Sequence, residues 1–228
     1  MNNQIHPTAI IEGDVEFGSD NHIDAYCILR GPLKIGSGNR IFPFVTIGTP
    51  GEDTRNPHYD SSKSPISIGD NNIIREYTAI QKPCYEEETK IENNVFIMHG
   101  VHIPHDAIIS DDSVITPGVI LGGMVRVLKG ANLAIGAKVS QRVVIGQYSI
   151  AAMGGSVLKN IKPFSRFIPG KPISVNYYAI EKFGFEDCIV EIENYVLRDL
   201  SPPAESRLHQ IISEYKEKTK IYNIDEYQ

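Results

Sequence analysis

The chain has 228 residues, 41% of them hydrophobic, and a formal net charge of −6. This length and composition predict one or two globular domains with a hydrophobic core. The sequence begins without a signal-peptide pattern and contains no apolar run of membrane-spanning length, so we expect a cytoplasmic protein. The three cysteines lie far apart in the sequence, which favours reduced thiols over disulfide bonds: Cys27, Cys84 and Cys188.

A period of six residues runs through most of the chain. Apolar residues recur at this step in three uninterrupted series, over 5–47, 68–80 and 91–157. Neither the helical period of 3.6 nor the strand period of 2 explains such a step. The pattern predicts an all-β solenoid of triangular coils, in which each side is a short strand with one apolar residue pointing to the axis. Glycine, aspartate and asparagine between these residues predict corners that tolerate positive φ.

Two segments interrupt the period. Residues 48–65 and 81–90 are rich in proline and polar residues, and insertions into a solenoid become surface loops that often carry function. We therefore predict a β-helix domain over residues 1–167 with loop insertions at 48–65 and 81–90, followed by a C-terminal helical domain over residues 168–228.

The six-residue step ends after residue 157. Residues 168–172 indicate a turn, and residues 173–185 and 186–200 have helical character, the second with apolar residues every three or four positions. Residues 201–218 offer a capping residue, prolines at a helix start and another amphipathic pattern. We expect a small helical cap that closes one end of the solenoid.

Charge is unevenly distributed along the chain. No acidic residue lies between Asp112 and Glu181, whereas eight lysines and arginines do. This local positive field favours a partner that carries phosphate or acidic groups, and an ordinary solvated face is the alternative. Seven of these residues form a predicted basic surface: Arg126, Lys129, Lys138, Arg142, Lys159, Lys162 and Arg166.

Three of the seven histidines, His99, His102 and His105, fall within seven residues, and the last two form the pattern HxxHD with Asp106. Imidazole suits proton transfer near neutral pH. Three imidazoles also suit zinc, but the zinc hydratases built on β-helices use an HxxxxH pair and a distant third histidine, so the HxxHxxH spacing disfavours a metal site. Asp106 is not expected to orient the His105 ring, because neighbouring residues in a strand point to opposite faces.

The period, the HxxHD pattern and the short helical tail together resemble the left-handed β-helix acyltransferases, and most closely the UDP-N-acetylglucosamine acyltransferases of lipid A biosynthesis. The resemblance covers residues 5–185 and is carried by IHPTAI, ISIGDNNIIRE, VHIPHD, ILGG and VNYYAIEKFGF. It implies a left-handed coil, whereas the general rule for parallel crossovers predicts a right-handed one. It also implies a homotrimer with active sites in the clefts between subunits.

The resemblance implies roles for individual residues. His105 would be the general base, the backbone amide of Gly123 would stabilise the oxyanion, and His102 would contact the sugar nucleotide. Further substrate-binding positions that it implies are Gln141, Asn176, Lys182, Asp53 and Arg55. His99 has no counterpart in the family, and we expect it at a surface or an interface.

The sequence also departs from the family. Met124 and Ser140 stand where the family has histidines, and Lys182 stands where it has an arginine, which leaves the acceptor sugar open. Met153 occupies the family's ruler position for the acyl chain, where a bulky side chain shortens the channel and each excluded methylene forfeits about 0.8 kcal/mol of burial. The alternative is that Met153 fills the core.

We expect an acyltransferase that moves a short or medium 3-hydroxyacyl group from a thioester, on acyl carrier protein or coenzyme A, to a nucleotide-activated sugar. The predicted basic surface would receive either donor. No bound cofactor, metal or nucleic-acid partner is expected. The alternatives are a coenzyme A-dependent N- or O-acyltransferase of a surface-polysaccharide amino sugar, a β-helix zinc hydratase, and a non-catalytic scaffold.

Overall fold

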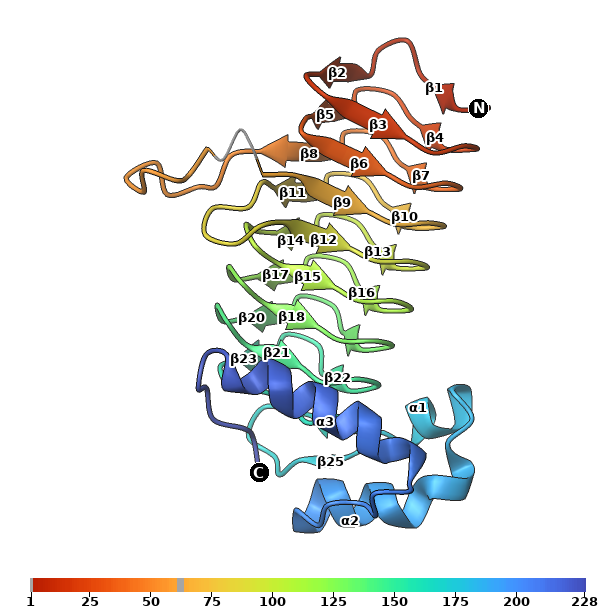
Figure 1. The fold of residues 1–228 in the computed structure, drawn as a ribbon, viewed down its shortest axis with the longest axis vertical. Helices are drawn as coiled ribbons and strands as arrows, with labels where there is room; N and C mark the ends of the chain where they lie inside the picture. Colours follow the sequence, from red (N-terminus) through yellow and green to blue (C-terminus); the bar gives the residue numbers. More distant parts are fainter. Residues whose placement is uncertain (1, 61–63) are drawn as a thin grey trace.

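A computed structural model describes residues 2–60 and 64–228. Short parallel strands wind into a triangular coil along most of this range, and helices follow at its C-terminal end (Figure 1). In Figure 1 the near strands run left to right and the far strands run back, while the chain descends from its N-terminus. The coil is therefore left-handed, as the resemblance implies.

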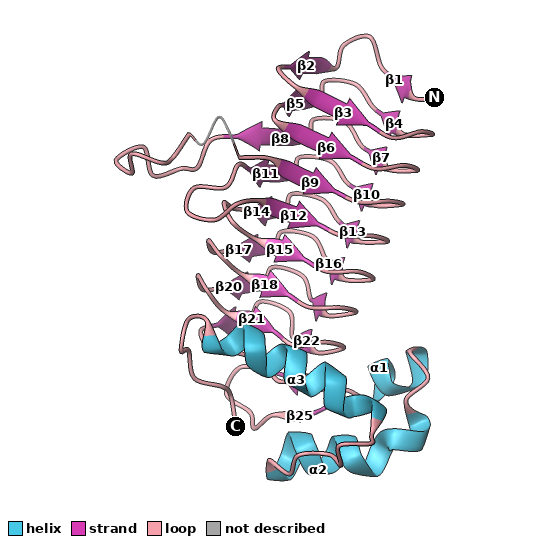
Figure 2. Cartoon of the chain, in the orientation of Figure 1, coloured by secondary structure: helices cyan, strands magenta, loops and turns pink. Residues whose placement is uncertain are grey.

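The described strands form three sheets, one on each side of the triangle (Figure 2). Sheet A contains β1 (Gln4–Ile5), β4 (His22–Ile23), β7 (Arg40–Ile41), β10 (Ile73–Ile74), β13 (Phe96–Ile97), β16 (Val114–Ile115), β19 (Asn132–Leu133), β22 (Ile150–Ala151), β24 (Ser165–Phe167) and β25 (Ser174–Val175). Sheet B contains β2 (Ile10–Glu12), β5 (Ile28–Arg30), β8 (Thr46–Thr49), β11 (Ala79–Gln81), β14 (His102–Ile103), β17 (Ile120–Leu121), β20 (Lys138–Val139) and β23 (Ser156–Val157). Sheet C contains β3 (Val15–Phe17), β6 (Leu33–Ile35), β9 (Ile66–Ile68), β12 (Thr89–Ile91), β15 (Ile108–Ile109), β18 (Arg126–Val127) and β21 (Val144–Ile145).

The residues of the six-residue period stack in the centre of the coil. Ile80 pairs in register with Ile47 and Ile103, and all three side chains are buried. This alignment brings apolar side chains of successive coils into contact and removes them from water, which is the main source of stability in such a fold. Ile5 and Ile11 depart from the prediction: they are 40% and 39% exposed, because a neighbouring coil covers them on one side only.

Buried asparagines at the corner between sheets C and A tie successive coils together. The side-chain oxygen of Asn21 accepts the backbone amide of Asn39 at 2.9 Å, and the side-chain oxygen of Asn39 accepts that of Asn72 at 2.9 Å. Each coil thereby provides a hydrogen-bond acceptor for a buried backbone amide of the next coil. Buried polar groups need such partners.

Both predicted insertions leave the coil at the corner between sheets B and C. The first runs from β8 to β9 and extends away from the solenoid, and the second joins β11 to β12 (Figure 1). Because β8 reaches Thr49, β11 includes Gln81 and β12 begins at Thr89, the predicted limits of 48–65 and 81–90 are slightly too wide. The described parts of the two loops, residues 50–60 with 64–65 and residues 82–88, are called loop 1 and loop 2 below.

The C-terminal segment differs in detail from the prediction. It contains α1 (Tyr177–Lys182), η1 (Glu186–Cys188), α2 (Ile189–Arg198) and α3 (Arg207–Lys220). The segment 173–185 begins as β25, which pairs antiparallel with β24. The last helix starts only at Arg207, where the Ser206 hydroxyl accepts the Leu208 amide at 3.2 Å, so the prolines precede its cap.

The C-terminal segment and the coil share one hydrophobic core, which includes Ile180, Ile192 and Leu208 together with the buried residues of the strands. Helix α3 also lies against β21, where Tyr215 packs with Leu128 and Val144. The division into two domains at residue 167 therefore stays a prediction. Among residues 2–60 and 64–228, no helix is both long and apolar enough to cross a membrane.

Candidate active site

His105 lies at the corner between β14 and β15, where the chain passes from sheet B to sheet C. The corner residues of successive coils stack in register. The amide of Met124 donates to the carbonyl of His105 at 3.1 Å, and the amide of Arg142 donates to the carbonyl of Gly123 at 2.9 Å. Gly123 and Gln141 therefore occupy, in the next two coils, the same corner position as His105.

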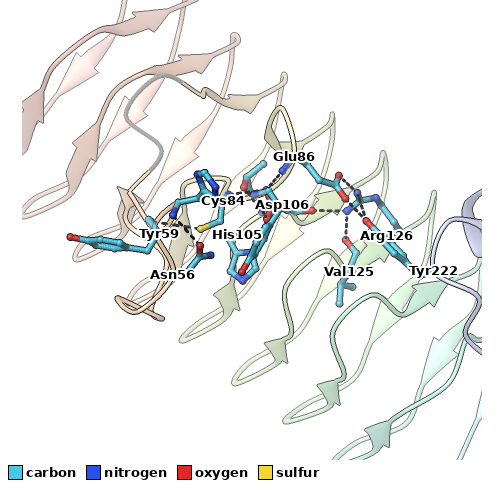
Figure 3. A network of polar contacts seen from close by, with 12 residues as sticks. Asn56, Tyr59, Cys84, Glu86, His105, Asp106, Val125, Arg126 and Tyr222 are labelled. Atoms are coloured by element: carbon cyan, nitrogen blue, oxygen red, sulfur yellow. Dashed lines mark hydrogen bonds and ion pairs between the residues drawn. The ribbon is translucent and has the colours of Figure 1, made fainter.

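The imidazole of His105 is hydrogen-bonded to the carboxylate of Asp106, with 2.7 Å between Nδ1 and Oδ2 (Figure 3). The prediction that these neighbours point apart is wrong, because they lie at a corner where Asp106 has a φ of 62° and not in a strand. An ionised carboxylate only accepts hydrogen bonds, so Nδ1 must carry the proton that it donates. In the neutral ring the lone pair is then on Nε2, which is what a general base needs.

The Asp106 carboxylate is fully buried and is held by the backbone of loop 2. It accepts the amides of Cys84 at 2.9 Å, Tyr85 at 3.1 Å and Glu86 at 2.9 Å, while its own amide donates to the Thr89 hydroxyl. Burial alone would raise the pKa of Asp106, but the hydrogen bonds from His105 and these amides outweigh it and lower the pKa below its usual value. Asp106 is thus ionised and fixed, and it fixes the His105 ring.

A pocket of about 240 Å³ opens beside His105. Loop 1 and loop 2 supply most of its wall, and the coil corners supply the rest: Gly51, Asp53, Asn56, Tyr59, Cys84, Tyr85, His105, Met124, Gln141 and Arg142. Asn56, Tyr59, Cys84 and Tyr85 are missing from the residues that sequence comparison with the family suggests. The sequence does carry one signal for these residues: the interruptions of the six-residue period mark both loops as insertions.

Cys84 of loop 2 contacts loop 1. Its thiol donates to the carbonyl of Tyr59 at 3.7 Å, and a side chain on Gly51 would collide with its sulfur. Burial, with the nearby Asp106 charge, raises the pKa of Cys84 to about 11. The raised pKa keeps the thiol protonated near neutral pH, whereas the thiolate is the reactive form of cysteine, so we assign Cys84 to packing of the loops.

Gly123 faces the His105 ring directly. A Cβ atom at this position would lie 2.4 Å from Cε1 and 2.6 Å from Nε2 of His105, closer than any real contact. The Gly123 amide has no recorded acceptor within the described part of the chain, so it is free to bind a ligand. A donor of this kind next to the base is the arrangement that stabilises a developing oxyanion.

Gly123→Ala is expected to lower kcat at least about tenfold with little loss of stability, because the new methyl group turns the His105 ring away from Asp106. Gly136→Ala is the matched control: its Cβ meets open space, but its φ of 68° disfavours alanine. The control should lower the melting temperature and leave kcat unchanged. Equal kcat for the two variants, measured by steady-state kinetics beside thermal unfolding, would contradict this role of Gly123.

His102 projects from the outer face of sheet B, in register with Ala79 and Ile120. Its Nε2 lies 3.6 Å from the Glu52 carboxylate of loop 1, beyond hydrogen-bonding distance, and no partner is recorded for this nitrogen among the described residues. A half-buried imidazole nitrogen without a partner is available to a ligand.

The other substrate-binding positions separate into two groups. Asp53 and Gln141 line the pocket of His105. Arg55 does not line it: its side chain is 90% exposed and bound to Asp53 at 2.7 Å. The hydrogen bond from Arg55 lowers the pKa of Asp53.

Asn176 and Lys182 lie elsewhere, in a small cleft between sheet A and α1. Asn176 is buried and its amide donates to the carbonyl of Tyr148 at 2.8 Å, which holds the start of α1 against the coil. The nitrogen of Lys182 lies 4.9 Å from the centre of the Phe183 ring. Within one chain these two residues are not brought to His105.

The predicted basic surface needs correction. Arg126 and Lys162 are only 4% and 2% exposed, and their charges are paired with Glu86 and Asp199. They are largely buried, and acidic residues from distant segments neutralise their charges, so they add little positive charge to the surface. The remaining residues are exposed but lie on different faces: Lys138 on sheet B, Arg166 on sheet A, Arg142 at the pocket, and Lys129 and Lys159 within 3.6 Å and 3.7 Å of carboxylates.

Met153 lies at a corner between sheets A and B, whereas His105 lies between sheets B and C. Its side chain is 68% exposed, so the alternative that it fills the core is wrong. Within one chain the proposed ruler and the proposed base are at different corners of the triangle.

The three clustered histidines do not converge. His99 is at the corner between sheets A and B, where its ring meets Tyr77 edge to face at 5.4 Å, while His102 is on sheet B and His105 at the next corner. In the part of the chain that is described, no group of three histidines, cysteines or carboxylates is arranged to hold a metal ion.

Comparison with known sequences identifies similar proteins. The family described as bacterial transferase hexapeptide (six repeats) matches residues 88–123. The acyl-[acyl-carrier-protein]–UDP-N-acetylglucosamine O-acyltransferase of Pseudomonas putida is 31% identical over 158 residues, 68% of this chain and 60% of that protein. The protein of the same name from Syntrophobacter fumaroxidans is 31% identical over 203 residues, 80% of this chain and 77% of that protein. The chain thus spans about 60% of the length of the Pseudomonas relative.

Solved structures agree with the sequence relatives. The UDP-N-acetylglucosamine acyltransferase of Francisella novicida superposes with a TM-score of 0.75 at 25% identity, over 97% of this chain and 86% of that one. The enzyme of Bacteroides fragilis gives a TM-score of 0.70 at 27% identity, over 93% and 94% of the two chains. The similarity therefore includes the C-terminal helices as well as the coil.

Proposed function

This chain belongs to the acyl-[acyl-carrier-protein]–UDP-N-acetylglucosamine O-acyltransferase family, and from that premise we propose that it transfers an acyl group from a thioester to a nucleotide-activated sugar. The observation that carries the proposal is the His105–Asp106 pair, whose 2.7 Å hydrogen bond leaves Nε2 free beside a pocket. The donor is acyl carrier protein or coenzyme A carrying a short or medium 3-hydroxyacyl group.

The proposed mechanism uses each group of the site once. Nε2 of His105 takes the proton of the acceptor hydroxyl as its oxygen attacks the thioester carbonyl. The Gly123 amide donates to the oxyanion of the tetrahedral intermediate, and the buried Asp106 carboxylate stabilises the imidazolium that forms. When the intermediate collapses, the C–S bond breaks and the imidazolium returns its proton to the leaving thiolate.

The pocket provides groups that suit a sugar nucleotide. Asp53, Asn56 and Gln141 offer carboxylate and amide groups for sugar hydroxyls, and His102 offers an unpaired nitrogen nearby on sheet B. The exposed guanidinium of Arg142 suits a phosphate. Within one chain Arg55, Asn176 and Lys182 do not line the pocket of His105. We propose that a second copy of the chain supplies them as substrate contacts.

A homotrimer would bring separate corners together. Large apolar side chains are exposed on sheet B and at its corner with sheet A: Ile120, Ile135 and Met153. A neighbouring subunit would cover them, and cyclic symmetry would repeat the contact three times. In such an assembly Met153 of one subunit limits the acyl chain bound beside His105 of another. Light scattering after size-exclusion chromatography measures the molar mass of the assembly and so tests whether it is a trimer.

Met153→Gly is expected to move the preferred acyl chain towards greater length. Each methylene that becomes buried adds about 0.8 kcal/mol, or roughly a factor of four in kcat/KM. The measurement is kcat/KM across donors of graded chain length, with Ile135→Gly, one coil away at the same corner, as control. A preference that is unchanged in Met153→Gly would remove Met153 from the acyl site.

A second candidate is a coenzyme A-dependent N- or O-acyltransferase of an amino sugar. Met124 favours it, because an apolar side chain lines the pocket beside His105 where the family has a histidine. The testing experiment offers UDP-N-acetylglucosamine with 3-hydroxyacyl carrier proteins and, separately, amino-sugar nucleotides with short-chain acyl coenzyme A. Product from the first set supports the leading proposal, product from the second set alone supports the alternative, and transfer with neither contradicts both.

A further inference from the structure

A cluster of three polar side chains connects the C-terminal tail to the active-site corner. Glu86 belongs to loop 2, Arg126 to β18, and Tyr222 follows α3. The Glu86 carboxylate accepts hydrogen bonds from the guanidinium of Arg126 and from the hydroxyl of Tyr222, as Figure 3 shows. The sequence separations of 40 and 136 residues mean that only the folded chain assembles this cluster.

The cluster holds Asp106 from two sides. Nη1 of Arg126 donates to the backbone carbonyl of Asp106 at 2.6 Å. The backbone amide of Glu86 donates to the Asp106 carboxylate at 2.9 Å. Glu86 therefore contacts Asp106 through its backbone and the cluster through its side chain. A shift of that side chain would pull the amide away from the carboxylate that orients His105.

Tyr222 binds Glu86, the member of the cluster that is partly exposed to solvent. Arg126 is 4% exposed, so its charge needs close partners, whereas the Glu86 side chain is 31% exposed and could turn to water. The Tyr222 hydroxyl gives the Glu86 carboxylate a second hydrogen bond besides that from Arg126. Burial, followed by the hydrogen bond to Glu86, raises the pKa of Tyr222 to about 12, so the hydroxyl keeps the proton that it donates.

The Tyr222 ring also reaches the wall of the pocket. It lies 6.0 Å from the guanidinium carbon of Arg126 and 5.9 Å from that of Arg142, which lines the pocket. Helix α3 sets this position, because it packs on β21 and ends two residues before Tyr222. The tail thus lies against the corner that carries the site.

We propose that Tyr222 is a positioning residue for His105, acting through Glu86 and the amides of loop 2 on the Asp106 carboxylate. The inference rests on the proposed function. The C-terminal tail would then have two roles. It closes the end of the coil, and its docking sets the geometry of the His105–Asp106 pair.

The test compares Tyr222→Phe with Tyr227→Phe in the full chain. Tyr227 is a matched control: it lies on the same tail, and its hydroxyl accepts the Leu158 amide at 2.8 Å, away from Asp106. Removal of the Tyr222 hydroxyl should lower kcat about tenfold with KM for the nucleotide sugar nearly unchanged. Tyr227→Phe should leave both constants unchanged, and the melting temperatures of the two variants should be similar.

A second readout follows the His105–Asp106 hydrogen bond itself. The Nδ1 proton of His105 gives a downfield proton resonance, and its exchange with solvent should be faster in Tyr222→Phe than in wild type or Tyr227→Phe. Glu86→Gln, which weakens the acceptor but keeps the side-chain shape, should show the same effect. An unchanged resonance and kcat in both Tyr222→Phe and Glu86→Gln overturn the inference. If wild type transfers no acyl group, the proposed function fails, and the resonance alone decides the inference.

Discussion

Replacing His105 with alanine is expected to lower kcat about 10²- to 10⁴-fold, the contribution of a positioned general base. The acceptor hydroxyl would then have to lose its proton to water. Because the ring is partly exposed at the pocket and its loss leaves the coil intact, the melting temperature and the Kd for the nucleotide sugar should change little. Steady-state kinetics, thermal unfolding and calorimetric binding measure the three quantities.

His99→Ala is the control for this experiment. His99 lies six residues earlier, at the preceding corner of the triangle, where its ring contacts Tyr77. It should retain the kcat of the wild type. Similar losses in both variants would mean that histidine replacement acts through the fold and not through proton transfer.

Asp106→Asn is expected to damage both activity and stability. Asparagine cannot accept from His105 and from three backbone amides at once, and its amino group would face some of these donors. We expect a loss of about 3 kcal/mol in the free energy of unfolding, because a buried hydrogen-bonded carboxylate is removed. The fall in kcat should be about 10²-fold or more, since the ring loses the partner that fixes its tautomer and stabilises its charge.

The stability loss should depend on pH in one direction. The pKa of Asp106 is lower in the folded chain than its usual value of about 3.9, so the carboxylate stabilises the fold at neutral pH. That contribution disappears as the pH falls from about 3.9 through the folded-state pKa, so wild type and Asp106→Asn should converge in acid. Urea unfolding from pH 7 downwards measures the difference, and a gap that widens in acid would contradict the assignment.

Asp111→Asn is the matched control for Asp106→Asn. Asp111 also accepts a backbone amide from the coil above, that of Asn93 at 2.8 Å, but it lies at the corner between sheets C and A. Its replacement should reduce stability without changing kcat.

The sequence predicts the coil well because one physical requirement repeats. Each side of every coil must place an apolar residue on the axis, so Ile47, Ile80 and Ile103 can be recognised without knowledge of their partners. The hand of the coil is different: the general crossover rule predicts the opposite sense, and only the resemblance implied the left-handed one.

The site was predictable only in part, because its support comes from segments without a period. His105 and Gly123 follow from the HxxHD pattern and the family. The role of Asp106 does not, because a rule for strands fails at a corner with positive φ. Arg126 and Lys162 were misplaced for a related reason. Their partners, Glu86 and Asp199, lie 40 and 37 residues away, and a charge pattern along the sequence does not report such pairing.

Nε2 of His105 is the proton acceptor of the proposed mechanism, and added imidazole tests this role most directly. In His105→Ala, imidazole can enter the space of the missing ring at the pocket. Acyl transfer should recover as the imidazole concentration rises and as the fraction of imidazole in its neutral form rises. A folded variant that binds the nucleotide sugar yet shows no recovery, or that transfers as fast as wild type without imidazole, would contradict it.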